Sequence, residues 1–67
     1  MSIELVKQWQ DNPDSVTAEQ IDEALQSMKL LLPTGANQCL FGALSSIKTG
    51  SHSNVAVLVQ RYEKQTA

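Results

Sequence analysis

The sequence predicts an all-α fold, a small compact domain of about four short helices. Apolar residues recur at spacings of three and four along most of the chain, which is the period of a helix. Proline, glycine and helix-capping residues divide the chain into short segments with short connections between them. A chain of 67 residues allows one domain, which we assign to residues 1–67.

A core of this size is only marginally stable, and small domains usually add disulfides, a metal or a second subunit. Cys39 is the only cysteine, so no intramolecular disulfide can form. One cysteine and one histidine provide no zinc-binding spacing, and we expect no metal and no cofactor. Of these three ways to stabilise a small core, homodimerisation is the one that the sequence still allows.

The first helix is expected at residues 3–11, before the break at Asn12–Pro13. Ile3, Val6 and Trp9 are three residues apart and therefore lie on one face of that helix. Trp9 is the only tryptophan. We expect it to anchor the core or an interface, because a large aromatic side chain buries much apolar area.

The second helix is expected at residues 18–32, and its start is the most clearly specified in the chain. Thr17 and Gln20 have the spacing of a capping box, in which each side chain binds a free backbone N–H at the other residue. Pro33 disfavours helical geometry at the residue before it and ends the helix. The apolar stripe of this helix comprises Ile21, Ala24, Leu25, Met28, Leu31 and Leu32.

Two further helices are expected at residues 36–48 and 54–65. Gly50 can adopt the left-handed conformation that ends a helix. Residues 54–59 include three β-branched valines and could form a strand, but such a strand would have no partner in this chain. The helix-favouring residues that follow, and the helical spacing of Val55, Leu58 and Val59, favour a helix instead.

The stretch GALSSIKTG, residues 42–50, resembles the Walker A phosphate-binding pattern except at one position. Ile47 stands where the second glycine is required, and a β-branched residue resists the positive φ that such a loop needs. The segment before it has a helical pattern, whereas a Walker A loop follows a strand. We therefore interpret this stretch as the end of a helix.

The sequence offers no catalytic constellation, and we expect no enzymatic activity. His52 is the only histidine and lies in a polar loop, and Cys39 lies thirteen positions away on a helix. Asp22 and Glu23 are adjacent in sequence, so on a helix they point to different sides and do not form a general acid–base pair.

Charge is distributed unevenly along the chain. Residues 1–28 carry six acidic side chains and one lysine, a balance of −5, whereas residues 29–67 carry four basic side chains and one glutamate, a balance of +3. The two halves together give the net charge of −2. They can complement each other within one molecule or across an antiparallel pair of molecules.

A small DNA-binding regulator with a helix-turn-helix is the alternative function. The second and third helices are joined by a short turn, and Asn37 and Gln38 could read bases. The low positive charge disfavours this alternative, because phosphate neutralisation supplies most non-specific affinity for DNA. The candidate contacts to an anion or to nucleic acid are Lys48, Ser51, His52, Asn54, Arg61 and Lys64.

The function we expect is that of a small cytoplasmic protein-interaction or regulatory module, which self-associates and binds a protein partner of unknown identity. No secretory signal is visible at residues 1–14, and no apolar run is long enough to span a membrane. Large apolar residues near helix ends or beside the main stripes are the candidate interface: Trp9, Leu30, Leu32 and Phe41. Leu30 is the residue least able to find cover within its own chain.

Overall fold

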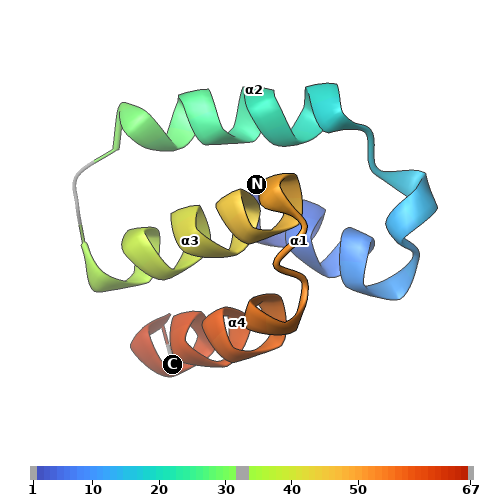
Figure 1. Cartoon of the computed structure of the whole chain (residues 1–67). Coiled ribbons are helices and arrows are strands. Elements are labelled where there is room, and N and C mark those ends of the chain that lie inside the picture. The colour runs from blue at the N-terminus through green and yellow to red at the C-terminus, as the bar shows by residue number, and fades with distance from the viewer. Residues whose placement is uncertain (1, 32–33, 67) are drawn as a thin grey trace.

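The computed structural model describes residues 2–31 and 34–66, and within these residues the fold is all-α (Figure 1). In chain order, the elements are α1 (Ser2–Asp11), the 3₁₀ helix η1 (Pro13–Ser15), α2 (Ala18–Lys29), α3 (Gly35–Thr49) and α4 (Ser53–Thr66). The predicted fold class of four short helices is confirmed. Residues 54–59 belong to a helix, which removes the strand as an alternative.

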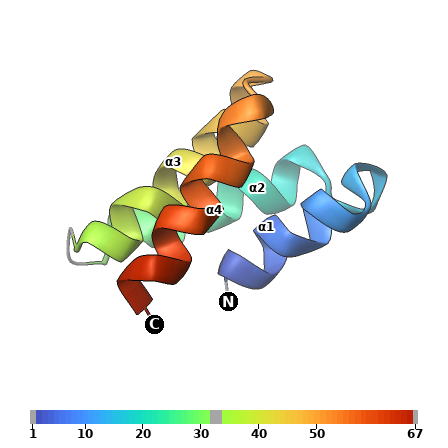
Figure 2. The ribbon, with the colours of Figure 1, turned by 90° about the horizontal axis from the view of Figure 1, so that it is seen from below.

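Helix α3 lies at the centre of the fold and packs against α1, α2 and α4. Helix α2 lies along one side of α3 and α4 lies along the other side, while α1 lies beside α3 (Figures 1 and 2). Both α2 and α4 run antiparallel to α3, as expected for helices that are joined by short connections. The outer faces of α2 and α4 therefore point away from each other.

The start of α2 confirms the predicted capping box. The Thr17 backbone N–H donates to Gln20 Oε1 over 2.9 Å, and the Gln20 backbone N–H donates to Thr17 Oγ1 over 3.2 Å. Two backbone donors that have no partner within the helix are satisfied in this way. Thr34 caps α3 similarly, because its hydroxyl oxygen accepts a hydrogen bond from the Asn37 backbone N–H over 3.2 Å.

Helix α2 ends at Lys29, three residues before the predicted end at residue 32. The Leu30 N–H donates to the Ser27 carbonyl over 3.2 Å and the Leu31 N–H donates to the Met28 carbonyl over 3.1 Å. These bonds span three residues, so the last turn has tightened to 3₁₀ geometry, as helix ends commonly do. Leu31 consequently leaves the apolar stripe in which the sequence placed it and is 52% exposed. Leu32 and Pro33 lie outside the described residues.

The stretch GALSSIKTG is the end of a helix, as predicted. Helix α3 continues through Thr49, Ile47 is buried, and Gly50 follows the helix in the left-handed conformation with φ of 87°. The Gly50 N–H donates to the carbonyl of Ile47. A turn then leads into α4, where the Asn54 N–H donates to the Ser51 carbonyl over 3.1 Å.

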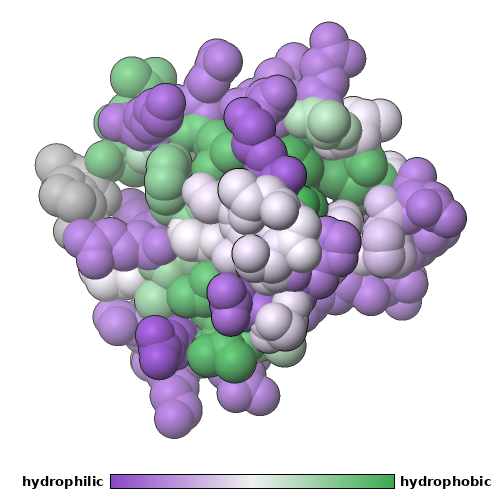
Figure 3. All heavy atoms as spheres, in the orientation of Figure 1, coloured by the Kyte–Doolittle hydropathy of each residue, from purple (hydrophilic) through white to green (hydrophobic). Residues whose placement is uncertain are grey.

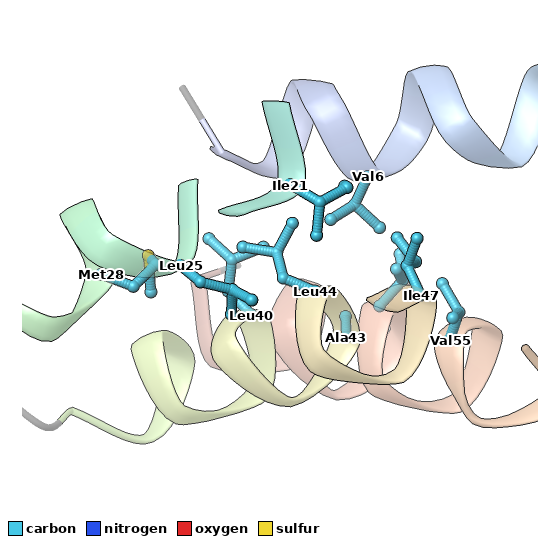
Figure 4. Close-up of a cluster of buried hydrophobic side chains, with 10 residues drawn as sticks. Val6, Ile21, Leu25, Met28, Leu40, Ala43, Leu44, Ile47 and Val55 are labelled. Atoms are coloured by element: carbon cyan, nitrogen blue, oxygen red, sulfur yellow. The ribbon is translucent and has the colours of Figure 1, made fainter. Parts of the chain in front are cut away.

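The core forms where α1, α2 and α4 meet α3. Figure 4 shows side chains of α2 pointing toward α3, with Leu44 of α3 among them and Val6 and Val55 contributed by α1 and α4. Leu44, Val6 and Val55 are the largest of the fully buried side chains. Gly42 allows α4 to approach α3 closely, because a Cβ atom at this position would lie 3.3 Å from Leu58 Cδ1.

Candidate interaction site

The end of α2 exposes two consecutive leucines to solvent. Leu30 is 88% exposed and Leu31 is 52% exposed. In Figure 3, hydrophobic atoms gather at this end of α2 beside the grey atoms, whereas the outer edge along the rest of α2 is mainly hydrophilic. The expectation that Leu30 finds no cover within its own chain is confirmed.

Phe41 lies half-buried at a groove between α2 and α3. The groove has a volume of about 370 Å³, and Leu25 lines it together with Phe41. Its remaining lining is polar: Asp22, Gln26, Lys29, Ser45, Lys48 and Thr49. Phe41 therefore also packs against the core, and it is only partly available to a partner.

Trp9 lies half-buried and packs edge-on against His52 of the turn between α3 and α4. The ring centroids are 4.7 Å apart and the ring planes meet at 71°, which is the edge-to-face geometry that aromatic rings favour. Trp9 also lines a second hollow of about 230 Å³ with Val16 and Ile47. The tryptophan thus ties α1 to the end of α3, and the exposed His52 covers part of its ring.

The four candidate interface residues do not form one surface. Trp9 lies in the second half of α1, whereas Leu30 lies at the end of α2, and these two segments are at opposite ends of the molecule (Figures 1 and 2). Phe41 lies in the groove between α2 and α3. Of the described candidates, only Leu30 is almost fully exposed, and Leu32 lies outside the described residues.

The candidate anion contacts are also divided. Lys48 Nζ lies 2.6 Å from Asp22 Oδ1, so its charge is offset by an acid of α2. His52 packs against Trp9. In the turn that contains it, Ser51 offers an anion only a short hydroxyl side chain. Arg61 and Lys64 lie on α4, on the other side of α3 from α2.

The geometry of α2 and α3 differs from that of a DNA-binding helix-turn-helix. In that motif the two helices meet at roughly 90–120°, whereas α2 and α3 run side by side in opposite directions (Figures 1 and 2). The predicted base reader Asn37 is half-buried, and Gln38 is exposed.

Helices α2 and α4 each have an exposed face on the side opposite their buried residues. The buried residues of α2 are Ile21, Leu25 and Met28. The side of α2 turned away from them carries Glu19, Glu23, Gln26 and Leu30, all of them exposed, and we call these four residues the acidic face.

Helix α4 has a corresponding outer side. Val55 and Val59 are buried. The exposed residues turned away from them are Val57, Gln60, Arg61 and Lys64, which we call the basic face. Val57 is 49% exposed. Val57 is not among the interface residues expected from the sequence, although its position off the helical stripe that contains Val55 and Val59 is a usable signal.

Among residues 2–31 and 34–66 there is no group of three or more histidine, cysteine, aspartate or glutamate side chains that could hold a metal ion. Nor does this part of the chain contain a helix with the length and apolar character needed to cross a membrane. Comparison with known proteins finds no family model, no curated protein and no solved structure that matches the chain.

Proposed function

We propose that this chain is a small protein-interaction module that acts by binding another protein, without catalysis, and that the end of α2 is its principal contact. The observation that carries the proposal is the exposure of two consecutive leucines, Leu30 at 88% and Leu31 at 52%. We place the module in the cytoplasm, because the lone thiol of Cys39 fits a reducing compartment.

The free energy available at this surface supports the proposal. Fully burying a leucine side chain contributes about 1.5–3 kcal/mol. Scaled by the exposed fractions of Leu30 and Leu31, a partner that covers both gains about 2–4 kcal/mol. Single exposed apolar residues are common on protein surfaces. Leu30 and Leu31 are consecutive and both exposed, so one partner can cover both.

Site-specific photo-cross-linking in cells tests this proposal. A photoreactive amino acid placed at Leu30 should form adducts with protein, whereas the same group placed at Gln10 should not, because Gln10 is exposed and polar on α1. Adducts that are the same at both positions, or none at Leu30, would overturn the proposal.

A further inference from the structure

The acidic face of α2 and the basic face of α4 are complementary in both charge and apolar content. Glu19 and Glu23 are the charged residues of the first, and Arg61 and Lys64 are those of the second. None of these four side chains has an ion-pair partner within the described residues. Each face also carries one exposed apolar residue, Leu30 or Val57.

The only acid of α4 does not disturb its basic face. Glu63 Oε1 lies 3.7 Å from Lys7 Nζ, so this carboxylate is directed toward α1. In α2, Asp22 is directed toward α3, where it pairs with Lys48 over 2.6 Å. Each outer face therefore presents charges of a single sign.

The spacing of the residues selects one way of pairing the two faces. Leu30 follows Glu23 by seven positions, and Lys64 follows Val57 by seven positions. Seven residues span about 10 Å along a helix and return to nearly the same face. When the helices are antiparallel, Leu30 meets Val57 at one end and Glu23 meets Lys64 at the other. A parallel arrangement would place Leu30 against Lys64 and Glu23 against Val57, which leaves both charges without a partner.

The two faces cannot pair within one molecule. Helices α2 and α4 flank α3 from opposite sides, so their outer faces point in opposite directions (Figures 1 and 2). For the same reason, a closed dimer is not possible, because a molecule whose acidic face contacts its neighbour cannot also turn its basic face toward that neighbour. When a contact joins two different faces and the copies do not close into a ring, association continues into an open chain of copies.

We propose that a second copy of this chain covers the end of α2, and that copies associate head to tail, with the acidic face of α2 in one copy against the basic face of α4 in the next. This inference rests on the proposed function, since it identifies the protein that binds at Leu30. Each contact is a single helix pair, which is small and polar compared with stable interfaces. Association is therefore weak, dependent on protein concentration and sensitive to salt.

Sedimentation of two single variants and their mixture tests this inference. Leu30→Lys places a positive charge on the acidic face, opposite Val57, and Val57→Lys adds charge to the basic face and removes its apolar contact. Both side chains are exposed in the described structure, so both variants should keep the helicity of the wild-type chain. At low ionic strength, the average mass of the wild-type chain should rise past that of a dimer as its concentration increases, and each variant alone should remain monomeric.

The equimolar mixture is the decisive sample. Leu30→Lys retains an intact basic face and Val57→Lys retains an intact acidic face, so a single productive contact can form between them. The mixture should give a 1:1 dimer that does not grow further. Reversal of the charge pair provides a second check: Glu23→Lys and Lys64→Glu should each dissociate the assembly, and the double variant should restore it.

Each other outcome overturns the head-to-tail arrangement. If Val57→Lys associates like the wild-type chain and Leu30→Lys does not, the contact is symmetric through α2, and protein binding at Leu30 still stands. If the wild-type chain stays monomeric at millimolar concentration and low ionic strength, a second copy is not the partner. Cross-linking from Leu30 then decides independently whether the proposed function survives.

Discussion

Truncation of Leu44 and of Leu30 should have opposite consequences for folding and for association. Leu44 is 0% exposed at the centre of the core, and Leu30 is 88% exposed. Leu44→Ala removes roughly 2.4 kcal/mol of transfer free energy, at about 0.8 kcal/mol per methylene, and adds the cost of a cavity, for a total of about 2–5 kcal/mol. Leu30→Ala should change the free energy of unfolding by no more than about 0.5 kcal/mol.

These values are large relative to the stability of the chain. A domain of 67 residues is stable by roughly 3–10 kcal/mol in total. Leu44→Ala should therefore remove a large fraction of the free energy of unfolding and lower the urea midpoint, whereas Leu30→Ala should keep the wild-type unfolding midpoint and lose self-association. Urea titration followed by circular dichroism at low protein concentration measures the first effect, and sedimentation measures the second.

A comparable loss of stability in Leu44→Ala and Leu30→Ala would contradict this prediction. It would mean that Leu30 is buried in the single molecule, and neither the exposed end of α2 nor the interface proposed there would exist. Retention of full association by a well-folded Leu30→Ala variant would place the interface on another surface.

Three further predictions concern particular contacts. Thr17→Ala should lower the free energy of unfolding by about 1 kcal/mol in a urea titration, because it removes the cap of α2. His52→Ala should expose the ring of Trp9, which shifts its fluorescence emission to longer wavelength and lowers stability by about 0.5–1.5 kcal/mol. The wild-type chain should not retard duplex DNA in gel shifts even at low ionic strength, because Arg61 and Lys64 are the only two cations on the basic face.

Matched controls define what would contradict these three predictions. Ser27→Ala changes an exposed residue of α2 whose hydroxyl has no hydrogen-bond partner within the described residues, so it should not lower the free energy of unfolding. A loss equal to that of Thr17→Ala would argue against the capping box as the cause. Ser51→Ala should leave Trp9 emission unchanged, and a red shift of the same size would point to general loosening of the turn. DNA retardation that disappears steeply with added salt would restore the nucleic-acid alternative.

The sequence alone determined the identity of the elements because their signals are local. The capping box at Thr17 and the stop at Gly50 involve hydrogen bonds and φ values within a few residues, so their effect does not depend on the rest of the fold. The helical spacing of Val55 and Val59 also outweighed the β-branched character of residues 54–59, since both side chains are buried on one face. The position of Leu30 beside the apolar stripe of α2 likewise predicted its exposure, which is 88%.

How these helices pack together depends on contacts between residues that are distant in the chain. The contact between Trp9 and His52 joins residues that are far apart in the chain, and no local pattern indicates it. The end of α2 tightens to 3₁₀ geometry and leaves Leu31 52% exposed, although its spacing in the sequence places it on the apolar stripe. The placement of α2 and α4 on opposite sides of α3 separates the acidic and basic faces, and this separation follows from packing against a shared central helix. The uneven distribution of charge along the chain is visible in the sequence, but the surface on which each charged residue lies depends on the fold.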